Sequence, residues 1–363
     1  MEGASVPPRD GAPPQLDPVR RVLVIRHRAA GDLLLTTPAL RALRAGLPGR
    51  RIEVLVARGL GELLEGNPDV DSVIEFDRRA LGSQLGLYAR LARGGYDLVL
   101  DLVSNPRSAW MTALTRAPIR AGYAIPGREW AYTLAVPRDP MGPAGPVLRY
   151  APEAALDVVR ALGLTPRGVE LTFRVSRWAE EAAEGSMRQA GVSPANPTIL
   201  CLPAGSWSSK TWLPERFARV MDELDDEMPG DVVWMWGPGE RDLAEQCRDL
   251  MRRRSIVAPP MGWQEMGGWM KRAALWVGND SGPKHVAVAL GLPTVTVFGP
   301  THPATWHPPD GPHRVVLAEG LECLHCNAND CPLPGDRHLR CMRDVTVDRV
   351  VHAVRSLYPT EAR

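Results

Sequence analysis

The chain has 363 residues, 44% of them hydrophobic and 23% charged, with a formal net charge of +1. A chain this long exceeds what one hydrophobic core usually supports, so we expect two domains. The near-neutral charge argues against a nucleic-acid partner, and no apolar run is long enough to cross a bilayer. The opening MEGASVPPRDGAPPQLDPVRR has no apolar signal core, which favours a cytoplasmic protein with a disordered tail over residues 1–20.

The first half of the chain alternates between strand and helix patterns. Short apolar stretches predict four strands, at residues 22–25, 51–57, 70–77 and 96–102. Periodic apolar residues predict helices between them, the clearest at residues 33–46 and 81–92. This alternation predicts an α/β structure in which helices cover a sheet of parallel strands.

A second alternating series follows a stretch of different composition. Residues 137–152 are rich in proline and glycine, which predicts a surface connection. Helices are predicted at residues 153–163, 179–191 and 346–358, and strands at 198–205, 231–237, 274–280 and 293–299. We therefore expect an N-terminal domain over residues 21–175 and a C-terminal domain over residues 176–363. Ligands bind beyond the carboxyl ends of strands in open α/β sheets, so the turns there hold the candidate sites.

The strongest motif is GNDSGPKHVAVALGLPTVTVFGPT, at residues 278–301. A buried strand ends near Asp280, and either Asp280 or Ser281 could cap the helix that follows. The free N–H groups at the start of that helix would bind an anion, and Gly282 would let a phosphate approach closely. The alternative is a capped helix beside a tight turn, with no ligand.

Cationic side chains would strengthen such an anion site. Lys284 and His285 lie in the first turn of the same helix, where they could add positive donors. The segment PAGSWSSKTWLPERF, residues 203–217, supplies small hydroxyl donors such as Ser206, and its Lys210 is the kind of compact cation that binds a diphosphate. This segment could also be an ordinary polar loop.

The segment WGPGERDLAEQC begins like a dinucleotide-binding fingerprint, with Gly237 and Gly239 after a strand. The third glycine of the fingerprint would fall at Asp242, so the match fails. Glu240 could instead accept hydrogen bonds from a ribose diol. The chain also lacks a G-x-x-x-x-G-K-[ST] loop, a G-x-S-x-G elbow and an H-E-x-x-H helix, which argues against an ATPase, a serine hydrolase and a zinc peptidase.

The first strand runs into a charged turn within VLVIRHRAAGDLLLTTPALRALRAGLPG, residues 22–49. Gly31 permits a close approach of the backbone to a ligand. Asp32 could be a plain N-cap of the next helix, or it could accept the proton of an attacking hydroxyl. Arg26 and Arg28 would attract an anionic acceptor.

Four cysteines fall close together near the C-terminus, in the pattern C-x2-C-x4-C-x9-C. They are Cys323, Cys326, Cys331 and Cys341. Structural zinc is one interpretation, because disulfides are disfavoured in a reducing compartment. The spacing does not give two CxxC pairs, so reduced thiols in a compact loop, residues 323–341, are the other.

Three of these motifs, in the same order, resemble glycosyltransferase family 9, the heptosyltransferases of lipopolysaccharide core synthesis. The segments that resemble the family are 22–49, 203–217 and 278–301, and the resemblance extends over residues 22–358. The resemblance implies the GT-B type of fold, two Rossmann-like domains facing each other across a cleft. It also implies inverting transfer of a heptose, or a related sugar, from an ADP-activated donor to a lipid-linked core saccharide, with no metal or other cofactor required.

The resemblance also assigns roles to individual residues. It implies Asp32 as the catalytic base, Lys210 on the donor diphosphate and Glu240 on the ribose. The other implied donor-binding residues are Ser206, Met261 (beside the adenine), Asp280, Ser281, Gly282 and His285. The acceptor-binding residues would be Arg26, Arg28, Arg107 and Arg120. A lipid-linked acceptor and a basic N-terminal domain favour peripheral contact with the cytoplasmic face of the inner membrane.

Two departures leave other functions open. His27 and Arg28 make the first turn more basic than is usual in the family, and LRYAPEAA replaces a histidine often found before the linker helix. A GT-B transferase or epimerase that uses a UDP-sugar is therefore one alternative. A non-enzymatic interaction module stabilised by zinc is another.

Overall fold

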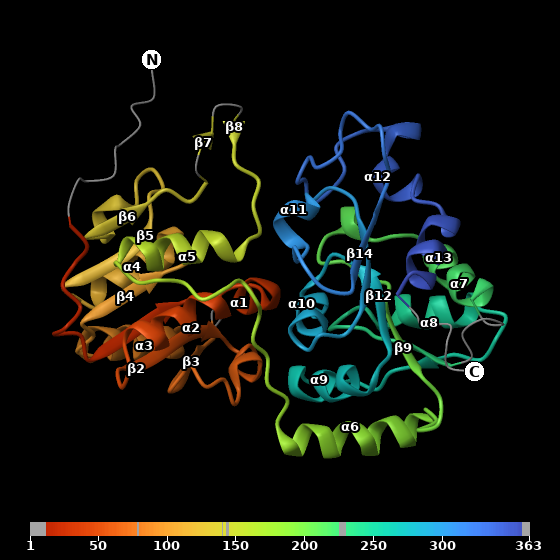
Figure 1. Cartoon of the computed structure of the whole chain (residues 1–363), viewed down its shortest axis with the longest axis horizontal. Helices are drawn as coiled ribbons and strands as arrows, with labels where there is room; N and C mark the ends of the chain where they lie inside the picture. The colour runs from red at the N-terminus through yellow and green to blue at the C-terminus, as the bar shows by residue number, and fades with distance from the viewer. Residues whose placement is uncertain (1–11, 78–79, 140, 143–144, 225–229, 358–363) are drawn as a thin grey trace. The chain divides into compact units, whose positions relative to one another are not determined.

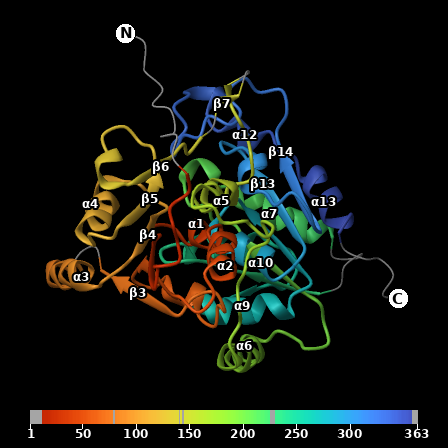
Figure 2. The ribbon, with the colours of Figure 1, turned by 60° about the vertical axis from the view of Figure 1, so that its left-hand side comes forward.

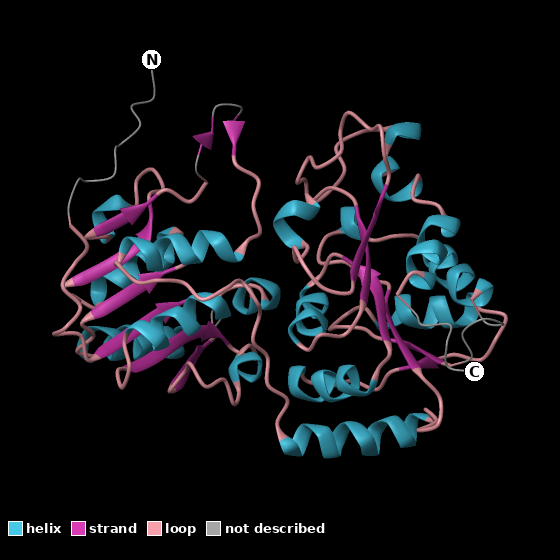
Figure 3. Ribbon diagram, in the orientation of Figure 1, coloured by secondary structure: helices cyan, strands magenta, loops and turns pink. Residues whose placement is uncertain are grey.

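The computed structural model describes residues 12–77, 80–139, 141–142, 145–224 and 230–357. The chain divides into two compact units, with the boundary between Thr172 and Phe173. Each unit is a sheet covered by helices, as the ribbon coloured by secondary structure shows (Figure 3). No helix in the described part of the chain is long and apolar enough to cross a membrane.

The first unit contains a six-stranded parallel sheet with the strand order β3-β2-β1-β4-β5-β6. Its strands are β1 (Arg21–Ile25), β2 (Arg51–Ala57), β3 (Ser72–Phe76), β4 (Leu98–Asp101), β5 (Ile119–Tyr123) and β6 (Leu134–Val136). The central strands are almost entirely apolar because helices cover both faces of the sheet. Of the tail predicted for residues 1–20, residues 1–11 lie outside the described part of the chain. The packed chain begins before β1, since Val19 is buried and the Arg20 N–H donates to Asp97.

Helices lie on both faces of this sheet, with α3 and α4 on the face away from α2 and α5 (Figures 1 and 2). The helices are α1 (Ala30–Leu34), α2 (Thr37–Gly46), α3 (Leu81–Arg93), α4 (Pro106–Leu114) and α5 (Pro152–Ala161), with the short 3-10 helices η1 (Gly61–Leu64) and η2 (Glu129–Ala131). The prediction of a single helix at residues 33–46 is wrong, because the helix is interrupted between α1 and α2. Pro38 has no N–H with which to continue the helical hydrogen bonds, and the hydroxyls of Thr36 and Thr37 donate to the carbonyls of Asp32 and Leu34 instead. The connection at residues 137–152 includes a short antiparallel pair, β7 (Met141–Gly142) and β8 (Gly145–Pro146).

The second unit repeats the arrangement, with the strand order β11-β10-β9-β12-β13-β14, all parallel. Its strands are β9 (Thr198–Leu202), β10 (Asp231–Trp234), β11 (Ile256–Val257), β12 (Leu275–Asn279), β13 (Thr294–Phe298) and β14 (His313–Leu317). Its helices are α6 (Arg177–Ala190), η3 (Ser208–Lys210), α7 (Pro214–Glu223), α8 (Arg241–Leu250), α9 (Trp263–Arg272), α10 (Gly282–Ala289), α11 (Pro303–Trp306), η4 (Gly335–Arg337), α12 (Arg340–Arg343) and α13 (Val347–Arg355). Four fully buried tryptophans anchor this unit, namely Trp212, Trp234, Trp269 and Trp276.

In each sheet the chain therefore begins with a central strand, adds strands on one side of it and then crosses back to add strands on the other side. This order is that of a Rossmann-like fold, and it creates a crevice where the two directions part. We call this topological switch point the parting of the sheet. It lies between β1 and β4 in the first unit, and between β9 and β12 in the second. The loops that follow these four strands are thus where each unit can hold a ligand.

Candidate functional site

In the first unit, Arg26 connects the two loops at the parting of the sheet. Arg26 follows β1 and donates through Nη1 to the carbonyl of Leu102, which follows β4. Its Nη2 lies 3.1 Å from Oδ2 of Asp32 in α1. The Asp32 side chain keeps 28% of its surface exposed. The structure thus holds an accessible carboxylate in a fixed position at the carboxyl edge of the sheet.

Asp32 is not a helix cap, so that alternative is wrong. The N-cap of α1 is Ala29, and no side chain caps this helix. Ala29 has a φ of +52°, a backbone conformation that costs a non-glycine residue about 1–3 kcal/mol. Strain of this kind persists where the surrounding structure requires it, and here it lies three residues before the candidate base.

The other basic residues predicted for the acceptor differ in how they are used. Arg28 is exposed and Arg107 lies half-buried in the first turn of α4. Arg120 donates to the carbonyls of Ala131 (2.8 Å) and Ala117 (2.7 Å), so it braces η2, and its assignment to the acceptor stays a prediction. The expectation for His27 is corrected, since its ring is 1% exposed and packs against Phe76 and so does not lie open in the turn.

In the second unit, three side chains converge on the carboxylate of Asp280, which follows β12. Lys210 Nζ lies 2.8 Å from Oδ2 and Lys284 Nζ lies 2.6 Å from Oδ1. The hydroxyl of Thr301, after β13, donates to Oδ2 over 2.9 Å. The Lys210 ammonium also lies 4.2 Å from the ring centroid of Trp207. We call Lys210, Asp280, Lys284 and Thr301 the lysine cluster.

The loop that carries Lys210 depends on a glycine. A Cβ atom on Gly205 would come within 2.9 Å of the backbone of Lys210, closer than real Cβ contacts. The loop after β9 therefore folds back on itself only with glycine at this position. This fold places Lys210 beside the end of β12.

The electrostatics of the lysine cluster favour an anionic ligand. Burial alone would raise the pKa of Asp280, but the ammonium groups of Lys284 and Lys210 outweigh it and hold that pKa below its ordinary value. Burial lowers the pKa of Lys284, and the Asp280 carboxylate opposes this shift. Two ammonium groups thus share one buried carboxylate. A buried charge without a full counter-charge is costly, so an anion bound nearby would be stabilised.

The start of α10 adds uncharged donors. Ser281 occupies the N-cap position as predicted, but its side chain makes no capping hydrogen bond. The Ser281 hydroxyl is buried, and no partner for it is present among the described residues. The first N–H groups of a helix have no partner within it. The α10 terminus, with Gly282 as its first residue, therefore offers a hydroxyl and backbone donors to an anion.

The prediction that His285 adds positive charge is wrong. His285 is 3% exposed. Burial, reinforced by Lys284, lowers its pKa well below the ordinary value, so the ring is neutral near pH 7. A neutral ring can still donate or accept one hydrogen bond at its buried Nδ1, for which no partner is present in the described part of the chain.

The remaining donor candidates lie in loops at the same edge of the second sheet. Glu240 accepts a 2.9 Å hydrogen bond from the Gly237 N–H through Oε2, and burial raises the pKa of its carboxyl. Met261 is half-buried in the loop between β11 and α9, while Ser206 is exposed. Their places after β9, β10 and β11 fit one extended ligand along this edge.

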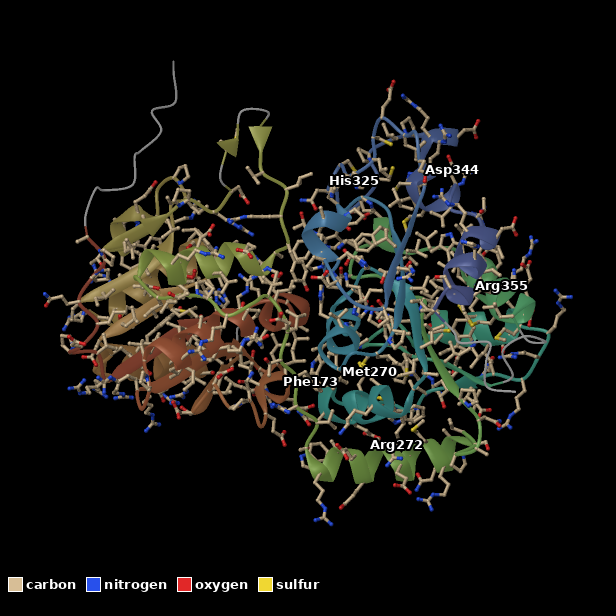
Figure 4. All side chains as sticks on the ribbon, in the orientation of Figure 1. Phe173, Met270, Arg272, His325, Asp344 and Arg355 are labelled. Atoms are coloured by element: carbon tan, nitrogen blue, oxygen red, sulfur yellow. The ribbon has the colours of Figure 1, made fainter. Side chains whose placement is uncertain are left out.

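The cysteine loop, residues 323–341, has a structural role that the sequence did not reveal. Ser209 donates to the Ala328 carbonyl over 2.7 Å, and the Asn327 N–H donates to the Pro300 carbonyl over 2.8 Å. His325, labelled in Figure 4, places Nδ1 3.0 Å from the carbonyl of Thr301. The loop therefore braces the turn that carries Lys210 and the turn that carries Thr301. The adjacent serines at 208 and 209, which both donate to this loop, are a sequence signal of the contact.

The cysteines are all free thiols. Burial raises the pKa of the Cys341 thiol to about 11, and the thiols of Cys326, Cys323 and Cys331 add to the shift. Among the residues that the structure describes, no three His, Cys, Asp or Glu side chains are grouped as ligands of one metal ion. The arrangement is that of a compact thiol loop, and structural zinc stays a prediction.

Two Rossmann-like units, with an accessible carboxylate in one and a buried cationic cluster in the other, define a GT-B type of transferase. The sequence profile of glycosyltransferase family 9 (heptosyltransferase) matches residues 85–335, and the chain belongs to this family. It is 26% identical over 294 residues to lipopolysaccharide heptosyltransferase 3 of Escherichia coli K12, an alignment that covers 77% of this chain and 83% of that protein.

Solved structures share the fold of this chain. A family 9 glycosyl transferase from Veillonella parvula DSM 2008 superposes with a TM-score of 0.81 at 24% identity, covering 95% of this chain and 99% of that one. The Escherichia coli ADP-heptose lps heptosyltransferase II superposes with a TM-score of 0.75 at 20% identity, covering 93% and 98%. The predicted fold class is confirmed, and so is the prediction of a glycosyltransferase. The interpretation as a non-enzymatic module is wrong.

Proposed function

We propose that the protein is an inverting glycosyltransferase that moves a heptose, or a related sugar, from an ADP-activated donor to a lipopolysaccharide-core type of saccharide. Its membership of family 9 and its likeness to a lipopolysaccharide heptosyltransferase support the class of reaction. The observation that carries the proposal is the lysine cluster, in which two buried ammonium groups share one carboxylate. Beside it lies the Ser281 hydroxyl, for which the described part of the chain offers no partner. This combination fits a diphosphate.

The donor would be held by the second unit. An ammonium group has three N–H donors, and Lys210 uses one of them on Asp280, which leaves others for the diphosphate. Asp280 then holds the two lysines in place. It does not itself contact the diphosphate, because a carboxylate and a phosphate are both negative and would repel each other. The N–H groups at Gly282 and the Ser281 hydroxyl would bind a second phosphate oxygen. Glu240 would accept from the ribose hydroxyls, and Met261 would pack on the adenine.

The first unit would supply the base. Asp32 takes the proton of the acceptor hydroxyl as that oxygen attacks the anomeric carbon of the donor. The bond from the anomeric carbon to the diphosphate breaks, and the diphosphate leaves with the electron pair. Lys210 and the start of α10 stabilise the charge that develops on it. A single displacement of this kind inverts the anomeric configuration. Arg28 and Arg107 would bind an anionic group of the acceptor.

The test is a transfer assay with ADP-heptose and a core-type acceptor, followed by NMR of the product to determine the anomeric configuration. We expect a product whose new linkage is inverted relative to the donor. A retained configuration would contradict single displacement at Asp32. No product from ADP-heptose, with a product from a UDP-sugar, would favour the UDP-sugar alternative.

A further inference from the structure

A fully buried carboxylate lies at the parting of the first sheet, and the proposed reaction does not use it directly. Asp101 is the last residue of β4, where it stands opposite Ile25 of β1. Burial raises the pKa of its carboxyl, and hydrogen bonds from Ser104, Ser108 and Tyr132 oppose this shift. Burying a carboxyl group is costly unless its hydrogen bonds are made, so the groups that it bonds indicate its role.

The two oxygens of Asp101 hold different parts of the unit. Oδ1 accepts from the N–H groups of Val103 (3.0 Å) and Ser104 (2.8 Å), in the loop that follows β4. Oδ2 accepts from the hydroxyl of Tyr132, which follows η2, over 2.8 Å. A Cβ atom on Gly122 would lie 2.5 Å from the Tyr132 ring, so the ring has room because this residue of β5 is glycine. Asp101 therefore ties the loop after β4 to the end of η2.

The loop after β4 is held in a conformation that it would not adopt alone. Ser104 has a φ of +51°, in the left-handed region that favours glycine. Its hydroxyl donates to the Asp101 carbonyl over 3.2 Å and accepts from the Tyr123 N–H over 2.8 Å. Backbone strain persists where the surrounding structure requires it. Here the hydrogen bonds to Asp101 and Tyr123 supply that requirement.

The same loop carries the anchor of Arg26. Leu102 follows Asp101 directly in the chain, and its carbonyl accepts from Nη1 of Arg26. Nη2 of Arg26 lies 3.1 Å from Oδ2 of Asp32. Two contacts in different directions give the guanidinium one orientation. A continuous series of contacts therefore runs from Tyr132 through Asp101 to the proposed base.

We propose that Asp101 and Tyr132 are positioning residues for the transfer reaction. They fix the loop after β4, so that the Leu102 carbonyl holds Arg26 and Arg26 holds the Asp32 carboxylate in the orientation that a general base needs. A catalytic group misplaced by about 1 Å can lose about 10² in rate, so a small shift of this loop is enough to lower turnover. The inference rests on the proposed role of Asp32 as the base.

The experiment is a double-variant cycle of Tyr132→Phe with Arg26→Ala, measured by steady-state transfer from ADP-heptose at saturating acceptor. Tyr132→Phe removes one hydroxyl and keeps the ring. We expect kcat to fall about tenfold, while the KM for the donor stays native, because the second unit holds the donor. In the Arg26→Ala background the same substitution should change kcat by less than about twofold, since the contact through which it acts is gone. Asp101→Asn should keep kcat within about threefold of native, because its amide oxygen still accepts from the two loop N–H groups.

Tyr150→Phe is the matched control. Tyr150 is as buried as Tyr132 (both 8% exposed), and no partner for its hydroxyl is present among the described residues. It should keep native kcat. Native kcat in Tyr132→Phe, or an equal fall with and without Arg26→Ala, would overturn the proposal and leave the network a purely structural one. Asp32→Asn, assayed in parallel, distinguishes this result from failure of the proposed function, because native turnover there would remove the base itself.

Discussion

The two sheets have the same strand order, yet the partings of the sheets carry opposite chemistry. In the first unit the parting holds the pair of Arg26 with Asp32, which solvent reaches. In the second unit it holds the buried lysine cluster around Asp280. Burial separates the two roles. A carboxylate that exchanges a proton needs access to its substrate, whereas cations that bind a diphosphate act most strongly where water is excluded.

The largest effect should come from Asp32→Asn, which removes the proposed base. We expect the turnover rate to fall by about 10² to 10⁴, while the affinity for ADP stays native, because the second unit holds the donor. Asp157→Asn is the matched control, since Asp157 is similarly exposed (23%) and pairs with Arg149 in the same unit. Steady-state transfer of radiolabelled heptose measures the rate. Native turnover by Asp32→Asn would remove the base from the first unit.

Asp280→Asn tests whether the buried carboxylate stabilises the lysine cluster. It leaves Lys284 buried without its counter-charge, which should lower the free energy of unfolding by about 3–5 kcal/mol. Asp32→Asn breaks a partly exposed pair and should cost no more than about 1 kcal/mol. Urea unfolding of both variants gives the comparison directly. Similar losses in the two would mean that burial does not distinguish the two sites.

Acid should weaken the second unit through its buried histidines. Burial, together with Lys284, lowers the pKa of His307 and of His313 to about 4, against an ordinary value of 6.5. The unfolded chain therefore takes up these protons at higher pH than the folded chain, so the free energy of unfolding falls as the pH drops from 6.5 to about 4. Above pH 6.5 this contribution is fully present. The Asp280 carboxylate adds no loss in this range, because its pKa is held below the ordinary value.

Thermal unfolding at pH values between 7 and 4 measures the slope of stability against pH. His313→Gln should flatten this slope, while His352→Gln, at an exposed position on α13, should leave it unchanged. An unchanged slope in His313→Gln would show that this buried ring is not what acid acts on.

The smallest effect is expected from Ser281→Ala. The Ser281 hydroxyl has no partner among the described residues, so its loss should leave the free energy of unfolding within about 0.5 kcal/mol of native. It should weaken ADP binding by about tenfold, since one hydrogen bond to a charged ligand is lost. Calorimetry and urea unfolding together measure the two effects. A marked loss of stability with native ADP affinity would make Ser281 a structural residue.

The sequence predicted which turns carry the chemistry, because polar and small residues directly after apolar strands stand out in a parallel sheet. The structure places Arg26, Asp32, Lys210 and Asp280 in such turns, as predicted, and their roles stay predictions. What each side chain contacts could not be predicted in the same way. Lys210 and Asp280 are 70 residues apart in the chain, and only the strand order brings them together.

The corrections have the same physical origin. His285 is neutral because of what surrounds it, and a histidine beside a lysine in the sequence gives no sign of that burial. The bracing of η2 by Arg120, through two backbone carbonyls, is likewise a contact that a sequence does not place. Short edge strands such as β11, with two residues, were missed because they carry too little periodic pattern.

The most direct test of the account is titration of the native chain and of Lys210→Met with ADP in a calorimeter, with Lys271→Met as control. Lys271 is an exposed lysine that pairs with Glu180 in the same unit. The account predicts that the native chain and Lys271→Met bind ADP equally, and more tightly than UDP. Lys210→Met should lose about 10² in affinity, the size expected for a charge-assisted contact to phosphate. Native ADP affinity in Lys210→Met, or no binding of ADP to the native chain, would contradict the claim that the lysine cluster holds the donor diphosphate.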